Sequence, residues 1–202
     1  MQNDLYKTIA KESQIDLRVK GSHFIGRAFP VTDRKKVKEI IVGVSEQHYD
    51  ATHNCYAYCV ENGKVERFND DGEPSGTAGK PILQAIKGND LLNILVIVTR
   101  YFGGTKLGTG GLVRAYGQAA GDAVNEAKII KKYRTRLLGI ECPYDLTNTL
   151  MKSIEKYDAK VVHSQFDDHM AYQLKVRSSR MDDFIDYIVE ESSGRITPIV
   201  LK

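Results

Sequence analysis

Residues 94–116 read ILVIVTRYFGGTKLGTGGLVRAY, an apolar run followed by a glycine-rich loop and then by a new apolar pattern. The run Ile94–Val98 is β-branched and apolar, which is typical of a strand buried on both faces. After the glycines, an alanine-rich apolar face recurs at helical spacing from Leu112 to Ala127. Because small side chains allow close approach, we expect this helix to pack tightly against a sheet.

The residues before this run contain further strands and two helices. The strands are expected at Ser22–Val31, Tyr56–Val60 and Val65–Phe68. Apolar residues at helical spacing from Val37 to Val44 predict a helix with Thr32 as its N-cap. A second, short helix is expected at Lys80–Lys87, directly before the buried strand. The pattern therefore predicts a sheet with helices packed on it.

A different pattern begins near Arg134. The expected elements are a strand through Leu138 and Ile140, a helix at Asp145–Tyr157, strands at Val161–Phe166 and Met170–Val176, a helix at Met181–Glu191 and a strand at Ile196–Leu201. That order, βαββαβ, is the ferredoxin-like motif. Asp167 to His169 are expected to form a hairpin turn. We therefore predict an α+β chain of two domains, residues 1–133 and 134–202, joined by a polar connection at about 130–135.

The composition is that of a globular protein without an overall charge bias. The chain has 202 residues, 42% of them apolar, and a net charge of +3, so any basic binding site must be local. Its apolar stretch Leu91–Val98 is far shorter than the about 20 residues of a membrane-spanning helix, and no secretory signal pattern opens the chain. Three cysteines without Cys-x-x-Cys spacing are typical of a reducing compartment. We expect a cytoplasmic protein without membrane contact.

The glycine-rich loop is the candidate binding site. Backbone N–H groups of a loop placed before a helix can converge on a phosphate, and the helix dipole adds positive potential. The residues predicted to bind phosphate or nucleic acid are Arg100, Gly103, Gly104, Thr105, Lys106, Gly108, Thr109, Gly110, Gly111 and Arg114. Their spacing matches neither a Walker A loop nor a Rossmann fingerprint. The alternative is that the glycines, Gly110 included, serve only turning and close packing of the helix against the sheet.

A second polar loop, residues 69–79 (NDDGEPSGTAG), supplies carboxylates and hydroxyls. The predicted rim of the phosphate site is Asp71, Glu73, Ser75, Thr77 and Lys80. A turn held by carboxylate-to-backbone hydrogen bonds is favoured over a catalytic serine, because no base for Ser75 is identifiable. His53, Cys55 and Cys59 are too widely spaced along a strand for one tetrahedral zinc. We therefore predict no catalytic residue, no metal and no cofactor.

Three long motifs resemble the IMPACT/YigZ family. They are Asn54–Tyr58 (NCYAY), Asp70–Pro81 (DDGEPSGTAGKP) and Arg100–Gly108 (RYFGGTKLG), in this order. The resemblance covers the whole chain and is to a complete, bacterial-type member. It implies an N-terminal domain of the ribosomal protein S5 domain 2-like fold and a ferredoxin-like C-terminal domain. This pair of domains is similar to the fourth and fifth domains of elongation factor G.

The resemblance implies a non-enzymatic role in translation. The likeness to elongation factor G suggests binding to the ribosome, to tRNA or to another structured RNA. Eukaryotic members of the family regulate translation through a protein partner, and they use an additional N-terminal domain for which this chain has no room. Two alternatives stay open. The chain could be an enzyme that holds nucleotide phosphates in the glycine loop, as S5-like kinases do, or a protein-interaction module.

Overall fold

A computed structural model describes residues 4–166 and 170–201. One compact unit spans Tyr6–Lys132, and the other begins at Tyr133 and includes the N-terminal residues up to Leu5. Asp4 groups with this unit because its carboxylate accepts hydrogen bonds from the backbone N–H and the hydroxyl of Ser179, at 2.8 and 2.5 Å. The division along the chain thus falls next to Tyr133, while the first residues belong with the second unit.

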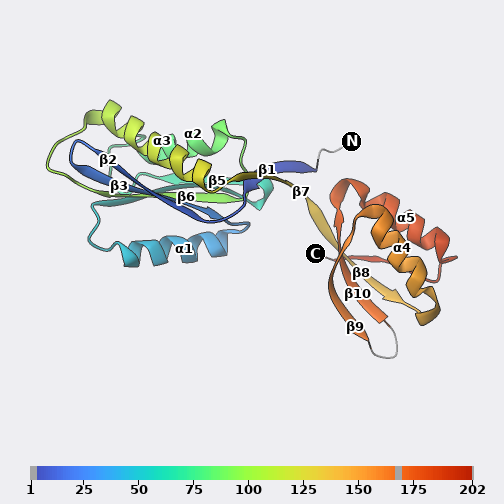
Figure 1. Cartoon of the computed structure of the whole chain (residues 1–202). Coiled ribbons are helices and arrows are strands. Elements are labelled where there is room, and N and C mark those ends of the chain that lie inside the picture. The colour runs from blue at the N-terminus through green and yellow to red at the C-terminus, as the bar shows by residue number, and fades with distance from the viewer. Residues whose placement is uncertain (1–3, 167–169, 202) are drawn as a thin grey trace. The chain divides into compact units, whose positions relative to one another are not determined.

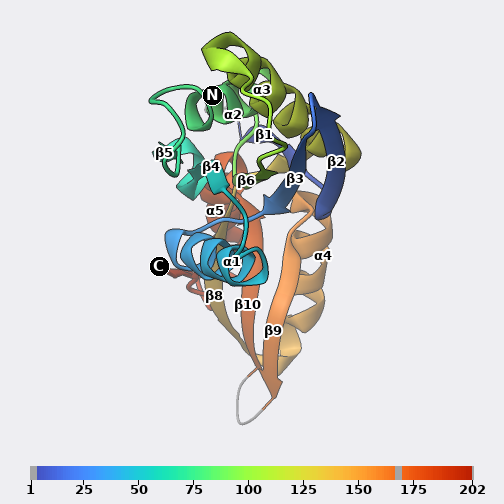
Figure 2. The same ribbon diagram turned by 90° about the vertical axis from the view of Figure 1, so that its left-hand side faces the viewer.

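The first unit is a five-stranded antiparallel sheet with helices on both faces (Figure 1). In sheet order the strands are β2 (Ser13–Val19), β3 (Ser22–Pro30), β6 (Ile94–Tyr101), β4 (His53–Val60) and β5 (Val65–Asn69). The helices are α1 (Arg34–Gln47), α2 (Gly79–Gly88) and α3 (Gly108–Glu126). A separate two-stranded sheet pairs β1 (Leu5–Ile9) with β7 (Ile129–Tyr133). Helices α2 and α3 cover one face of the larger sheet, and α1 lies on the other (Figure 2).

The main core lies between the sheet and the α2–α3 layer. Ala119, Ala120 and Ala123 of α3 are fully buried there, as the alanine-rich pattern predicted. Phe24 of β3 meets Tyr116 of α3 edge to face, with ring centroids 5.2 Å apart. A smaller core lies under α1 and includes the predicted helix positions Val37 and Val44. The one helix α1 packs mainly against β4 and leaves the part of this face over β2 and β3 less covered (Figure 2).

Several expected boundaries were wrong. Asp33, not Thr32, caps α1, because its side chain accepts a hydrogen bond from the Lys36 N–H at 2.9 Å. Strand β6 continues past Val98 to Tyr101, so Arg100 belongs to the sheet. The polar connection expected at 130–135 is mostly strand, because β7 runs to Tyr133 and β8 begins at Thr135. A lysine-rich strand resembles a polar linker in sequence, since exposed strand faces are also polar.

The second unit has the expected βαββαβ order. Its four-stranded antiparallel sheet has the order β11 (Ile199–Leu201), β8 (Thr135–Cys142), β10 (Met170–Arg177) and β9 (Lys160–Phe166). The helices α4 (Thr147–Tyr157) and α5 (Met181–Glu191) lie together on one face (Figure 1). Phe184 and Leu174 are fully buried between the two layers, while the opposite face of β10 is exposed. The hairpin expected at Asp167 to His169 lies outside the described residues.

In the part of the chain that the structure describes, no helix combines the length and the apolarity needed to cross a bilayer.

Replacing Gly26 with alanine tests how closely α3 approaches β3. The new Cβ would lie 2.5 Å from the backbone oxygen of Ala119, and overpacking of this kind costs about 1–3 kcal/mol. Gly43 of α1 is the matched control, because a Cβ has open space there and alanine favours a helix by about 0.5–1 kcal/mol. Urea unfolding should show a destabilised Gly26→Ala and an unchanged or stabilised Gly43→Ala. Equal stabilities would contradict the close contact.

Candidate functional site

The loop between β5 and α2 is folded around the side chain of Asp70. Its carboxylate accepts hydrogen bonds from the backbone N–H groups of Gly76 (2.9 Å), Ala78 (3.0 Å) and Gly79 (2.8 Å). The last two groups stand at the start of α2, where a helix leaves its first donors without backbone partners. Asp70 therefore caps α2 from outside the helix. The prediction of a turn held by carboxylate-to-backbone hydrogen bonds is confirmed.

A buried ion pair lies beside this turn. Arg100 Nη1 donates to Glu73 Oε1 at 2.5 Å, and the two side chains are only 6% and 3% exposed. The hydroxyl of Tyr116 in α3 donates to the same oxygen at 2.8 Å. Arg100 Nη2 donates to Ser22 Oγ, at the start of β3, at 3.3 Å. The pair thus joins the acidic loop, two strands and α3 in one network.

His53, the first residue of β4, borders the pair. Its Nδ1 lies 2.7 Å from the carbonyl oxygen of Asp71, which places a proton on Nδ1 because a carbonyl can only accept. Its Nε2 lies 3.8 Å from Glu73 Oε1. The Asp71 carboxylate in turn accepts from the backbone N–H of Asn54 at 2.5 Å. Both carboxylates are therefore engaged by protein groups, which suits a shaped loop better than a general acid or base.

The predicted rim residues divide into two groups. Glu73 and Thr77 are buried, and the Thr77 hydroxyl donates to the Pro74 carbonyl at 2.6 Å. Asp71, Ser75 and Lys80 are exposed. Only this second group, together with the exposed glycine loop, can meet a ligand from solvent.

Arg100 is placed differently from its predicted role as a phosphate ligand. It lies in β6, is neutralised by Glu73 and is 6% exposed, and the ring centroids of Phe24 and Phe102 lie 5.5 and 5.6 Å from its Cζ. A side chain in this position cannot reach a phosphate in solvent. The other predicted ligands are exposed, with Gly111 half-buried; they are Gly103, Gly104, Thr105, Lys106, Gly108, Thr109, Gly110 and Arg114.

The glycines of the loop serve different purposes. A Cβ on Gly103 would lie 1.9 Å from the backbone of Gly21, so close packing requires this glycine. Gly104 and Gly108 have positive φ angles of 85° and 69°, so turning explains both. For Gly110 the nearest atom to an added Cβ is a side-chain nitrogen at 3.6 Å, an ordinary contact distance. The alternative that Gly110 packs against the sheet is therefore wrong, and this glycine leaves the helix start open to solvent.

The start of α3 is electropositive. No side chain caps the helix, and its first turn contains no acidic residue, so the first N–H groups point outward without a carboxylate partner. Lys106 precedes these groups and Arg114 follows them, both exposed. The sequence prediction thus located the cationic loop, while it missed Ser22 and Tyr116 as the residues that anchor it. A tyrosine on a buried alanine-rich face was the available signal, because its hydroxyl needs a partner.

Comparison with known proteins is consistent with this architecture. The family model of the Impact N-terminal domain matches residues 20–124. "IMPACT family member YvyE" of Bacillus subtilis (strain 168) is 30% identical over 191 residues, which cover 94% of this chain and 88% of that protein. The chain belongs to the IMPACT family. "IMPACT family member YigZ" of Escherichia coli (strain K12) is 32% identical and covers 73% of this chain and 74% of its own length.

A solved structure described as "Crystal structure of an hypothetical protein" has a TM-score of 0.71 and 26% identity to the chain, over 98% of both. The part matched by the domain model lies within the first unit. It contains both the acidic loop and the glycine loop, so the IMPACT family domain carries the candidate site.

Within this IMPACT family domain, the groups around Glu73 are held protonated. Cys55 is fully buried, its thiol donates to the Asp70 carbonyl at 3.0 Å, and burial raises its pKa to about 12. Burial also raises the pKa of Tyr116, with Cys55 and Glu73 as further causes. Over residues 4–166 and 170–201, no group of three His, Cys, Asp or Glu side chains could hold a metal ion. The cluster therefore shapes the loop, and its thiol and phenol hydroxyl keep their protons.

Glu73→Gln tests the buried ion pair. Removing one partner leaves the Arg100 charge buried without compensation, which costs about 3–5 kcal/mol. Glu66→Gln is the control, because its pair with Lys87 (3.0 Å) is largely exposed and such pairs contribute about 1 kcal/mol or less. Chemical unfolding of the full chain measures both. A loss for Glu73→Gln no larger than that for the control would contradict the structural role of the pair.

Raising the pH should destabilise the fold through Cys55. An unfolded thiol ionises near pH 8.5, whereas the folded thiol keeps its proton up to about 12. Stability from this group is therefore complete below about pH 8.5 and falls by roughly 1.4 kcal/mol per pH unit above it. Chemical unfolding from about pH 8 to about pH 10 should show a steeper loss for the wild type than for Cys55→Ala. Parallel losses would show that the buried thiol does not contribute.

Proposed function

We propose that this IMPACT family protein binds the phosphate backbone of ribosomal RNA or tRNA and acts as a non-enzymatic factor in translation. The contact surface is the exposed part of the glycine loop, residues 103–111, with the start of α3. The observation that carries the proposal is the uncapped start of this helix, which has no acidic residue in its first turn and is flanked by exposed Lys106 and Arg114.

A phosphate is bound by hydrogen-bond donors and by positive charge. Free N–H groups at a helix start bind anions, and the helix dipole adds to the attraction. Gly110 has no side chain to cover these donors, and the atom nearest to an added Cβ is Arg114 Nη1 at 3.6 Å, so the arginine charge lies beside the helix start. A lysine and an arginine nearby supply the mobile charges that neutralise phosphates in RNA complexes. A local patch of this kind suits a protein whose net charge is only +3.

Binding is favoured over catalysis by the chemistry next to the patch. The thiol of Cys55 and the hydroxyl of Tyr116 are buried and keep their protons, and the Asp71 and Glu73 carboxylates are held by protein donors. From inside the fold, these groups fix the conformation of the acidic loop. Recognition of RNA by shape and by phosphate contacts requires a surface of this kind and no reactive group.

Two charge changes at the patch test the proposal. Lys106→Glu should weaken binding to bacterial 70S ribosomes and to bulk tRNA and should lower the log–log salt slope by about one unit or less. Gly110→Asp should also weaken binding, although an acidic residue in the first turn stabilises the helix by about 0.3–1 kcal/mol. A loss of binding in a stabilised protein cannot come from unfolding.

Lys38→Glu is the matched control, because this exposed lysine lies on α1, on the other face of the sheet. Co-sedimentation and fluorescence anisotropy at two salt concentrations measure the affinities. The proposal predicts losses for the two variants at the patch and none for the control. Equal affinities of all three variants and the wild type at both salt concentrations would refute RNA binding by this surface.

A further inference from the structure

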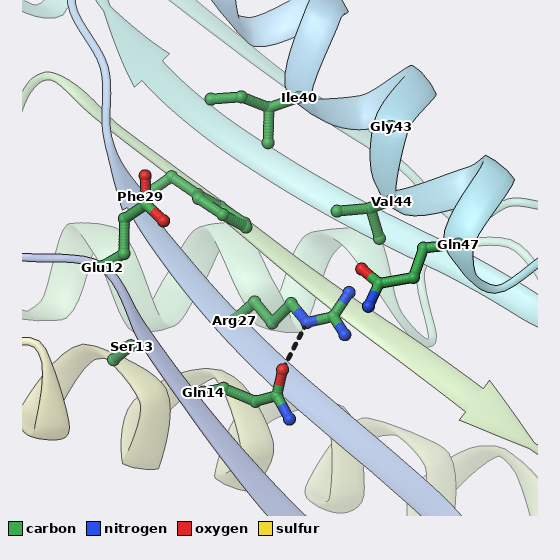
Figure 3. Close-up of a pocket in the computed structure, with 9 residues that line it drawn as sticks. All are labelled: Glu12, Ser13, Gln14, Arg27, Phe29, Ile40, Gly43, Val44 and Gln47. Atoms are coloured by element: carbon green, nitrogen blue, oxygen red, sulfur yellow. Dashed lines mark hydrogen bonds between the residues drawn. The ribbon is translucent and has the colours of Figure 1, made fainter.

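A separate cavity lies on the opposite face of the first unit, between α1 and the strands β2 and β3 (Figure 3). Its volume is about 500 Å³, which is within the usual range of small-molecule sites. The lining residues are Glu12, Ser13, Gln14, Arg27, Phe29, Ile40, Gly43, Val44 and Gln47. The cavity exists because the single helix on this face does not cover the sheet as far as β2.

Arg27 is the unusual residue of this cavity. It lies in the middle of β3 and is only 6% exposed. Its Nε donates to Gln14 Oε1 at 2.8 Å and its Nη2 to His48 Nε2 at 2.5 Å, but Nη1 is buried and has no hydrogen-bond partner. Figure 3 shows the guanidinium extending from β3 between the side chains of Gln14 and Gln47.

The charge of Arg27 is also uncompensated. Among the residues that the structure describes, no carboxylate forms an ion pair with it. Burial lowers the pKa of its guanidinium, and the more distant Tyr101 and Asp16 offset this only in part. Buried guanidinium groups are normally paired, because an isolated buried charge is costly. An anion bound in the cavity would supply both the missing acceptor and the missing counter-charge.

His48 fixes the direction of the guanidinium. Burial and the nearby Arg27 charge lower the pKa of His48, so the neutral ring accepts from Arg27 through Nε2. Its Nδ1 then donates to the hydroxyl of Tyr101 at 2.9 Å, and that hydroxyl donates to Asp50 at 3.2 Å. With Nε and Nη2 held in this way, Nη1 is the guanidinium nitrogen without a partner, and its two N–H groups are left for a ligand.

We propose that this cavity binds a small carboxylic acid with an apolar body. The carboxylate accepts a hydrogen bond from Arg27 Nη1, a charge-assisted contact. The apolar body packs against Phe29, Ile40 and Val44, which line the same cavity. Inorganic phosphate fits less well, because it has no apolar body to pack against Phe29, Ile40 and Val44. This site is independent of the RNA surface.

The probes for the test are 4-methylpentanoate, its neutral amide and inorganic phosphate. Titration of the full chain, followed by NMR of the Arg27 Nε–H and of the Ile40 and Val44 methyl groups, should show saturable shifts with the carboxylate. The amide and phosphate should bind at least about ten-fold more weakly. No saturable shift with the carboxylate up to about 10 mM, or equal binding of the amide or of phosphate, would overturn the proposal.

Two variants locate the site. Arg27→Met should fold with equal or greater stability, because replacing an uncompensated buried charge with an apolar side chain is neutral or stabilising, and it should lose binding by about ten-fold or more. Gly43→Leu should block the cavity, since a side chain there has open space. Gly121→Leu on α3 is the matched control with equally open space. Unchanged affinity in Arg27→Met or in Gly43→Leu would refute the site.

Discussion

The buried pair between Arg100 and Glu73 is the interaction on which the candidate site depends. Removing two charges from water is costly, so such a pair persists only where further donors and acceptors complete it. Here Tyr116 and Ser22 do so, at 2.8 and 3.3 Å. The Ser22 hydroxyl also accepts from the backbone N–H of Gly103 at 3.3 Å. The glycine loop therefore starts at a point fixed by the ion pair, and both loops of the site share one anchor.

The buried polar groups of the site and the exposed groups of the glycine loop have different roles. The Glu73 carboxylate, the Cys55 thiol and the Tyr116 hydroxyl are buried and hydrogen-bonded, and they determine the path of the backbone. At the surface of the glycine loop lie backbone N–H donors and two exposed cations, Lys106 and Arg114. Under the proposed function, these donors and cations contact RNA phosphates by position and charge. In this protein of the IMPACT family, the acidic loop thus supports the glycine loop.

Two arginines on neighbouring strands show that burial alone does not determine the role of a charged residue. Arg100 of β6 and Arg27 of β3 are 5% and 6% exposed. Arg100 faces the helices α2 and α3 and has Glu73 as its partner, so its charge stabilises the fold. Arg27 faces α1, and its hydrogen-bond partners Gln14 and His48 carry no negative charge. The same residue type is therefore structural on one face of the sheet, while on the other it indicates a ligand.

The sequence alone determined the element order, the two units and the location of the cationic loop, because hydrophobic periodicity and turn residues are local signals. The pattern around Val37 and the alanines of α3 gave the correct buried faces. Only the tertiary structure decided which charges remain free. Arg100 was grouped with Lys106 because both flank the glycines, yet Glu73, distant in sequence, neutralises it. Likewise, Arg27 is a single cation in an apolar strand until the fold places it beside a cavity, where none of the described residues forms an ion pair with it. Charge pairing depends on long-range contacts and on burial, and neither can be read from spacing along the chain.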